Sequence, residues 1–218
     1  MAGEFSCEIV TWDQFYNLAR LLSKIIKSSG YRPDLVIAIA RGGYVPARVL
    51  CDLLLRDQLT SIKVEHWGVA AVKKEQARIR SPLAIEITGL NVLIVDDLTD
   101  TGDTLAIATD YIRRFCPREI RTAVLQHKSD SVFQPDYYAE YIPRWSWIIY
   151  PWAFYEDLVG FTEKIVRDGE FSLQDIKEEL AGRYRIAVDE RELRDAIDDL
   201  ISDRKVVQTG SFYQGADG

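Results

Sequence analysis

The stretch VLIVDDLTDTGDTL, residues 92 to 105, combines acidic side chains, hydroxyls and a glycine directly after a run of apolar residues. Its polar members are Asp96, Asp97, Thr99, Asp100, Thr101, Gly102, Asp103 and Thr104. An apolar strand followed by such a loop and a helix leaves free backbone N–H groups at the helix N-terminus, where they and the helix dipole can hold a phosphate. The Thr101 and Thr104 hydroxyls add donors, and Gly102 lets the backbone approach the ligand closely. The pattern therefore predicts a phosphate-binding loop.

The carboxylates of this stretch need other partners, because they would repel the phosphate unless they face a different part of the ligand. Asp96 and Asp97 suit ribose hydroxyls, and a magnesium ion would join such a carboxylate region to a pyrophosphate. A helix cap alone needs only one or two residues of this kind, so four acids in this order go beyond capping. We therefore predict a site for a sugar phosphate that carries a second phosphate group.

The segments around this stretch indicate an α/β fold with a mostly parallel sheet. Strands are expected in DLVIAIA, SIKVEHW, NVLIVDD and EIRTAVLQH, and helices before Gly30, from Pro46 onward and from Asp103 to Phe115. Residues 68–89 lose this periodicity and are expected to form a loop. Continuous apolar strands that alternate with helices are covered on both faces, and ligands of such sheets bind beyond the carboxyl ends of the strands.

Over its full length, the stretch closely resembles the phosphoribosyl-pyrophosphate (PRPP) signature of type I phosphoribosyltransferases, and the order of elements in residues 1–158 is similar to that fold. The resemblance implies that PRPP is bound by Asp96, Asp97, Thr99, Asp100, Thr101, Gly102, Asp103 and Thr104. It also implies a magnesium ion held at Asp97, and Asp100 as the catalytic residue that accepts a proton from the base. Asp103 has no assigned partner, so we expect it to be the most replaceable of the four acids.

The segment IARGGYVPARVL is similar to the loop that holds the pyrophosphate of PRPP in this family. It implies Arg41, Gly42 and Gly43 as further PRPP-binding residues, after an Ala40–Arg41 peptide of a kind that is often cis in the family. RGG alone also fits an ordinary turn, but its place after the first strand favours the loop. Basic residues after Trp67 are similar in place to the flexible loop that closes over PRPP, and a solvated charged loop is the alternative. Which of them contacts pyrophosphate stays open: Lys73, Lys74, Arg78 or Arg80.

The transferred base is expected to be a purine. The region QHKSDSVFQPDYYAEYIPRWSWIIYPWAFYED resembles that of bacterial xanthine-guanine phosphoribosyltransferases, in which a lysine, an aromatic–aliphatic pair and a Pro-Trp pair frame the purine. It implies Lys128, Trp147 and Ile148 as purine-binding residues, next to Pro151–Trp152. Lys128 would donate to O6 of a 6-oxopurine and so reject adenine, Trp147 would stack, and the Ile148 backbone would meet the 2-position. A surface role is the alternative for Lys128, and the choice among hypoxanthine, guanine and xanthine stays open.

The composition changes after Gly160 and suggests a second domain. Two amphipathic helices and a hairpin around Thr209 and Gly210 predict a winged-helix-like module in residues 159–218, after a phosphoribosyltransferase domain with an aromatic hood in residues 1–158. A non-catalytic transcriptional regulator that senses PRPP or purines is the alternative function. Residues 161–218 contain 14 Asp or Glu and 9 Lys or Arg, which argues against contact with phosphate-lined DNA.

The composition of the whole chain argues against several other classes of protein. The 218 residues are 47% hydrophobic, enough for a buried core, and a net charge of -7 argues against a general nucleic-acid or anionic-membrane surface. Cys7, Cys51 and Cys116 are widely spaced and suggest neither a disulfide framework nor a zinc site. No apolar run approaches the ~20 residues of a membrane helix, and the first residues do not resemble a signal peptide. We expect a cytoplasmic enzyme, and the resemblance implies a homodimer that converts PRPP and a purine base to a nucleoside monophosphate.

Overall fold

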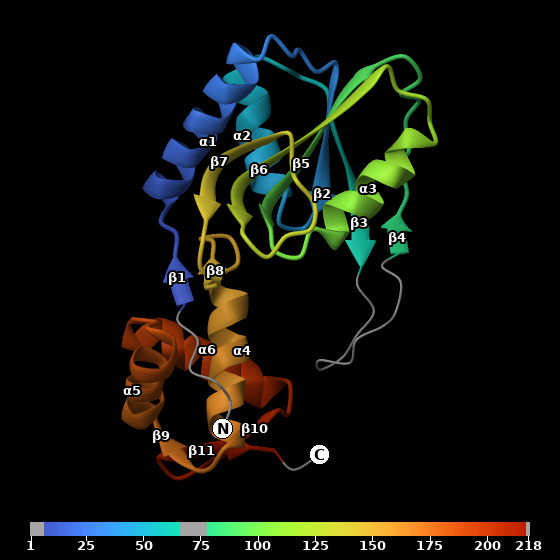
Figure 1. Ribbon diagram of the computed structural model, residues 1–218. Coiled ribbons are helices and arrows are strands. Elements are labelled where there is room, and N and C mark those ends of the chain that lie inside the picture. The colour runs from blue at the N-terminus through green and yellow to red at the C-terminus, as the bar shows by residue number, and fades with distance from the viewer. Residues whose placement is uncertain (1–6, 66–77, 217–218) are drawn as a thin grey trace. The chain divides into compact units, whose positions relative to one another are not determined.

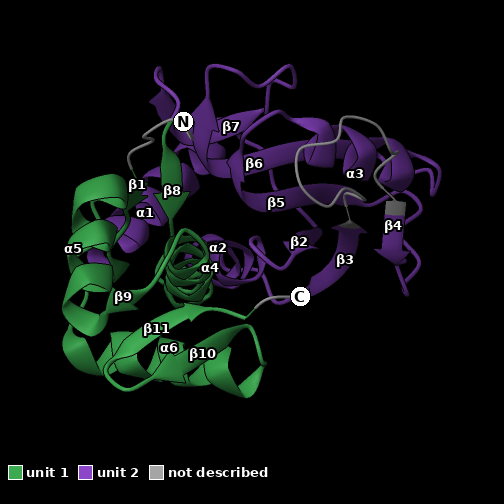
Figure 2. Cartoon of the chain, turned by 90° about the horizontal axis from the view of Figure 1, so that it is seen from below, with its two compact units in different colours: residues 1–12, 146–218 green, residues 13–145 purple. Residues whose placement is uncertain are grey.

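The computed structural model describes residues 7–65 and 78–216, and the chain divides into two compact units. One unit consists of residues 13–145 and the other of residues 1–12 and 146–218 (Figure 2). The acidic stretch of residues 92–105 lies wholly in the unit of residues 13–145.

The unit of residues 13–145 is built on a sheet that has six strands in the described residues, in the order β4-β3-β2-β5-β6-β7 (Figure 1). The strands are β2 (Leu35–Ala40), β3 (Leu59–Glu65), β4 (Arg78–Ser81), β5 (Asn91–Thr99), β6 (Glu119–Lys128) and β7 (Tyr137–Ile142). All neighbours are parallel except β3 and β4, which are antiparallel. The mostly parallel sheet predicted from the apolar runs is therefore confirmed.

The helices α1 (Trp12–Ser28), α2 (Tyr44–Leu54) and α3 (Asp103–Arg113) cover this sheet. Leu105 of α3 packs with Ile37 and Ile94 on one face, and Figure 1 shows α1 and α2 on the opposite side of the sheet. Because successive side chains of a strand point to opposite faces, Val36 and Ala38 of β2 are buried on that second face. Burial on both faces explains why β2 and β5 are continuously apolar.

The expectation of a loop throughout residues 68–89 is wrong for residues 78–81, which form β4 along the edge of β3. Ile79 packs against the apolar core of the unit, and Ile87 is fully buried in it. A strand of four residues with one apolar side chain is too short to show the alternation of apolar and polar residues by which strands are recognised in a sequence. Lys73 and Lys74 lie outside the described residues.

The other unit joins the start of the chain to its C-terminal part. β1 (Cys7–Ile9) pairs in parallel with β8 (Trp147–Ile149). The helices α4 (Phe154–Arg167), α5 (Leu173–Tyr184) and α6 (Glu190–Ser202) share an apolar cluster, and β9 (Phe171–Ser172), β10 (Val206–Thr209) and β11 (Phe212–Gly215) form an antiparallel sheet. The two amphipathic helices and the hairpin expected after Gly160 are confirmed as α5, α6 and β10–β11.

The helices of this unit begin where the sequence offers caps. Ser172 and Asp175 form a capping box at α5, and the Asp189 side chain accepts a hydrogen bond from the Glu192 N–H at the start of α6. In neither described part of the chain, residues 7–65 or 78–216, does a helix have the length and apolar character needed to cross a membrane.

The compact units divide earlier than the boundary expected after residue 158. That position falls inside α4, whose Leu158, Phe161 and Ile165 all lie in the apolar cluster that α4 shares with α5 and α6. α4 therefore belongs as a whole to the unit of residues 1–12 and 146–218, and the division lies between Trp145 and Ser146. The change of composition after Gly160 falls inside α4 and does not coincide with the division between the units.

Candidate active site

The carboxyl ends of β2, β5 and β6 lie at one edge of the sheet, because the three strands are parallel neighbours. A cavity of about 470 Å³ opens where β5 ends, and it is lined by the continuous run from Asp96 to Leu105. We call this run the acidic loop. All the polar residues that the sequence analysis selected in it line this cavity.

Gly102 lets the acidic loop turn into α3. It is the N-cap of the helix at φ +91°, in the left-handed region that favours glycine, and no side chain caps the helix. A Cβ at this position would lie 2.6 Å from both Ser131 Oγ and Phe133 Cβ. The segment after β6 therefore packs directly on Gly102, and the Val132 N–H donates to the Thr101 carbonyl at 2.9 Å.

Asp103, which the sequence left without a partner, accepts a hydrogen bond within the loop. The Thr101 hydroxyl donates to Asp103 Oδ2 at 2.9 Å. Both side chains are exposed at the start of α3, where the helix N-terminus favours a negative group. The single hydrogen of the Thr101 hydroxyl is thus engaged by Asp103, and the hydroxyl can donate to a phosphate only by turning away from it.

Asp96 and Asp97 form a close acidic pair at the end of β5. Asp96 Oδ1 accepts from the Asp97 N–H at 3.0 Å, and Asp97 Oδ1 accepts from the Leu98 N–H at 2.8 Å. Burial, and after it the charge of Asp97, raises the pKa of the Asp96 carboxyl well above its ordinary value. Two carboxylates this close suit ribose hydroxyls or a cation as further partners.

The RGG segment after β2 reaches the acidic pair. A Cβ added to Gly42 would overlap the Asp97 carboxylate, and one added to Gly43 would lie 2.7 Å from the Ile39 carbonyl oxygen. Both positions therefore need glycine for lack of space. The Ala40–Arg41 peptide is cis, as the resemblance implied.

Lys128 and Asp100 are in direct contact. Lys128 is the last residue of β6, and its ammonium lies 3.1 Å from Asp100 Oδ1. The same ammonium lies 5.2 Å from the centre of the Trp145 ring, within range of a cation–π interaction. The Lys128 side chain is buried, which rules out the alternative of a surface lysine at a strand end.

Thr99 has a partner that was not predicted from the sequence, His127. The Thr99 hydroxyl lies 2.7 Å from His127 Nδ1, and both side chains are buried. Thr99 lines the cavity, but its hydroxyl is hydrogen-bonded to His127. The expected strand ends at His127, whereas β6 continues to Lys128, so these two adjacent side chains point to opposite faces. Of the two, only Lys128 is on the face that contacts Asp100.

Trp147 and Ile148 belong to β8 in the other unit. The Trp147 indole N–H donates to Asp157 Oδ1 at 3.1 Å, and its ring is edge-on to Phe161. Burial raises the pKa of the Asp157 carboxyl. Ile148 is buried, and Trp152 stacks on Tyr150 with ring centres 4.7 Å apart.

Comparisons with known proteins agree with this geometry. The family model described as "Phosphoribosyl transferase domain" matches residues 11–157. Xanthine-guanine phosphoribosyltransferase from Gluconobacter oxydans is 32% identical over 146 residues, which cover 66% of this chain and 82% of the relative. The protein of the same name from Ruegeria sp. is 31% identical over 153 residues, covering 66% and 83%. Among solved structures, a purine phosphoribosyltransferase from Pyrococcus horikoshii superimposes with a TM-score of 0.60 at 30% identity, over 67% of this chain and 93% of that one.

Proposed function

Because the chain belongs to the phosphoribosyltransferase domain family, we propose that it is a purine salvage enzyme that converts PRPP and a 6-oxopurine to the nucleoside 5′-monophosphate and pyrophosphate. The observation that carries this proposal is the contact between the Lys128 ammonium and the Asp100 carboxylate beside the acidic loop. The names of the relatives from G. oxydans and Ruegeria support the purine class. They lend no support to the alternative of a non-catalytic regulator.

The reaction exchanges one bond at the anomeric carbon of PRPP. The bond from this carbon to the pyrophosphate oxygen breaks, and purine N9 supplies the electron pair of the new bond. Asp100 accepts the proton from N7, which makes N9 the nucleophile. Lys128 donates a hydrogen bond to O6, an acceptor that adenine lacks, so the same residue selects 6-oxopurines.

The acidic loop and the RGG segment divide PRPP between them. Backbone N–H groups at the start of α3 take the 5′-phosphate, with Thr104 as a hydroxyl donor and Thr101 as a second one once its hydroxyl turns from Asp103. Asp96 and Asp97 take the ribose hydroxyls, and the pyrophosphate lies on the RGG segment. The start of α3 supports this division, because no N-cap side chain occupies the free backbone N–H groups there.

The acidic pair also fits a magnesium ion. The described residues contain no group of three or more His, Cys, Asp or Glu that could hold a metal ion. A hard cation at Asp97, beside Asp96, would therefore need oxygen ligands from the bound substrate, and pyrophosphate offers them. When bound there, magnesium would offset the negative charge that develops on the departing pyrophosphate.

By resemblance to xanthine-guanine phosphoribosyltransferases, Trp147 and Ile148 are also proposed to bind the purine. In that role the Trp147 ring stacks on the purine, and the hydrogen bond from its indole N–H to Asp157 fixes the ring plane. The Ile148 main chain meets the 2-position. Contacts to backbone groups at the 2-position are compatible with hypoxanthine, guanine and xanthine alike.

Turnover assays with PRPP test the proposed function. Guanine, hypoxanthine and xanthine are offered separately, adenine serves as the matched control, and each reaction is repeated with the magnesium chelated. We expect formation of nucleoside monophosphate from at least one 6-oxopurine, little from adenine, and loss of turnover on chelation. A protein that converts none of the 6-oxopurines would refute the proposal.

For the C-terminal part we propose a winged-helix-like module, which the element order α4-β9-α5-α6-β10-β11 and the strand order β10-β11-β9 support. The acidic balance of residues 161–218 disfavours DNA as its partner. A gel shift with duplex DNA at low salt tests this, and tight, salt-sensitive binding would contradict it. The homodimer implied by the resemblance and the cytoplasmic location expected from the sequence stay predictions.

A further inference from the structure

Thr99 and His127 form a buried polar pair at the carboxyl ends of β5 and β6. They are register partners across the two strands, and only 2% and 4% of their surfaces are exposed. The Thr99 hydroxyl lies 2.7 Å from Nδ1 of His127. Neither side chain takes part in the proton transfer proposed above, although Thr99 directly precedes Asp100 in the chain.

The contact continues from His127 to Gln134. Nε2 of His127 lies 3.2 Å from Gln134 Oε1, and the rings of Tyr138 and Tyr141 lie beside the imidazole with centres 5.2 and 5.8 Å away. Because an amide oxygen can only accept, Nε2 carries the hydrogen, and Nδ1 accepts from the Thr99 hydroxyl. The imidazole therefore holds this hydroxyl in one orientation.

His127 cannot itself reach the groups that react. Successive side chains of a strand point to opposite faces, so His127 and Lys128 lie on opposite faces of β6. The Lys128–Asp100 contact lies on the Lys128 face. His127 can therefore act on Asp100 only through Thr99, whose main chain leads directly into Asp100.

The residues that follow Asp100 are held by separate contacts. The Thr101 carbonyl accepts from the Val132 N–H, and Gly102 packs against Phe133. Asp100 thus lies between two anchored neighbours. Loss of the Thr99 anchor would free its main chain on one side, while the proposed phosphate-binding residues keep their own support.

We infer that His127, with Gln134 behind it, is a positioning residue that fixes Asp100 through the Thr99 hydroxyl. The inference rests on the proposed function, because it assigns His127 a role in the reaction of that same site. Misplacing a reacting group by about 1 Å can cost about a hundredfold in rate. The pair therefore acts on turnover and leaves PRPP binding largely unchanged.

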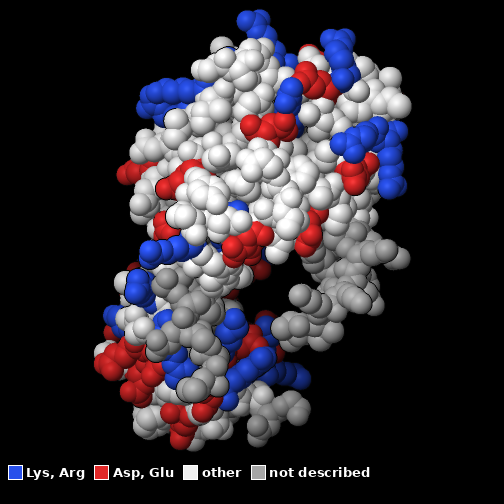
Figure 3. All heavy atoms as spheres, in the orientation of Figure 1, with Lys and Arg blue, Asp and Glu red and all other residues white. Residues whose placement is uncertain are grey.

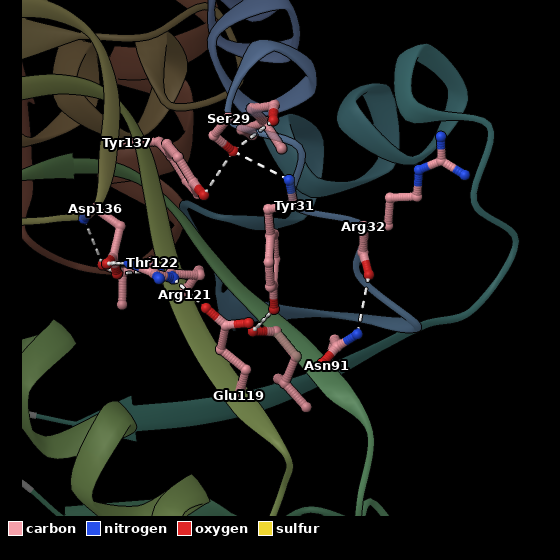
Figure 4. A network of polar contacts seen from close by, with 11 residues as sticks. Ser29, Tyr31, Arg32, Asn91, Glu119, Arg121, Thr122, Asp136 and Tyr137 are labelled. Carbon is pink, nitrogen blue, oxygen red and sulfur yellow. Dashed lines mark hydrogen bonds and ion pairs between the residues drawn. The ribbon is translucent and has the colours of Figure 1, made fainter.

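A second buried threonine of β6, Thr122, also makes a side-chain hydrogen bond and supplies a matched control. Thr122 is also 2% exposed, and its hydroxyl donates to Asp136 at 2.9 Å (Figure 4). This pair lies in the part of β6 near Glu119 and Arg121, toward the amino end of the strand. Thr122→Val therefore removes the same buried hydroxyl from the same sheet without touching the acidic loop.

The test compares kcat and the KM for PRPP in Thr99→Val, Thr99→Ser and Thr122→Val, at a temperature where circular dichroism shows every variant folded. We expect Thr99→Val to lower kcat about tenfold to hundredfold and to raise the KM for PRPP by a much smaller factor. Thr99→Ser keeps the hydroxyl and should stay close to wild type, and Thr122→Val should keep its kcat. His127→Asn, whose side-chain oxygen can replace Nδ1 as acceptor, should retain more turnover than His127→Leu.

Equal kcat in Thr99→Val and Thr122→Val would overturn the inference. So would a loss in Thr99→Ser as large as that in Thr99→Val, because the hydroxyl would then be irrelevant. A wild-type protein that converts no purine would refute the proposed function and this inference with it. Wild-type turnover combined with an unaffected Thr99→Val would reject the inference alone.

Discussion

The ammonium of Lys128 lies 3.1 Å from the carboxylate of Asp100, although the two side chains differ sharply in exposure. Only 3% of the lysine side chain is exposed, against 43% of the aspartate side chain. A charge removed from water needs an ionic partner far more than a charge that water still reaches. The protein should therefore respond differently to the loss of each member of the pair.

Replacement of Lys128 should affect catalysis more than stability. In Lys128→Met an apolar chain of similar length occupies the buried path and Asp100 stays hydrated, so we expect the free energy of unfolding to change by less than about 1.5 kcal/mol. A hydrogen bond to a charged donor is worth about 1.5–3 kcal/mol, so kcat/KM with guanine should fall about tenfold to hundredfold. Steady-state kinetics measures this, with the exposed Lys27→Met as control. Guanine kinetics like wild type in Lys128→Met would contradict the assigned role.

Replacement of Asp100 should lower both catalysis and stability. Asp100→Asn removes the proton acceptor, and we expect turnover to fall about a hundredfold or more, with little change in PRPP affinity measured by equilibrium titration. It also leaves the buried Lys128 ammonium without an opposite charge, so the free energy of unfolding in urea should fall by about 1–3 kcal/mol, more than in Lys128→Met. Unchanged turnover would reject Asp100 as the base.

Gly30 and Gly102 have similar positive φ angles but different surroundings. Replacing each by alanine therefore distinguishes the cost of the left-handed backbone from the cost of steric overlap. Gly102 (φ +91°) has Ser131 and Phe133 within 3 Å of a built Cβ, whereas Gly30 (φ +78°) has nothing within 4 Å. Gly30→Ala should cost about 1–2 kcal/mol of unfolding free energy for the left-handed conformation alone. Gly102→Ala should cost more and should also raise the KM for PRPP at least about tenfold, because the loop must move. Equal behaviour of the two variants would show that the contacts at Gly102 do not matter.

Cys7 predicts a pH dependence of stability in the alkaline range. Burial, followed by the charge of Asp157, raises the pKa of its thiol from 9.0 to about 11. A pKa that is higher in the folded state contributes stability that is fully present below pH 9.0 and is lost as the pH rises through about 11. Urea unfolding across this interval should show a shallower loss in Cys7→Ala than in wild type. Cys116→Ala, which removes an exposed thiol, should keep the wild-type slope.

The parts of the fold that sequence reasoning recovered are those with a long, strong pattern. β2 and β5 are continuous apolar runs because both faces of the sheet are covered, and the acidic loop combines several independent requirements in a few residues. β4 has a single inward residue, Ile79, and β1 spans only Cys7–Ile9, so neither is long enough to show a period.

The candidate site was predictable where residues follow one another and hidden where strands bring them together. The contact between Lys128 and Asp100 depends on the pairing of β5 with β6, which no local pattern encodes. The same pairing places His127 beside Thr99, and a histidine and a threonine inside two apolar strands carry no sign of each other in the sequence. Their hydrogen bond becomes visible only once the register is known.

The pairing of β1 with β8 makes the unit of residues 1–12 and 146–218 discontinuous in the chain. During synthesis, residues 7–9 are made first, and their partners at residues 147–149 only after the whole of residues 13–145. Domains tend to fold in the order in which they leave the ribosome. The C-terminal unit is therefore completed last, and its folding requires residues 7–9, which were synthesised long before the rest of the unit. A fragment that begins at residue 146 lacks one of its own strands, and transplanting this unit to another protein would require residues 7–9 to travel with it.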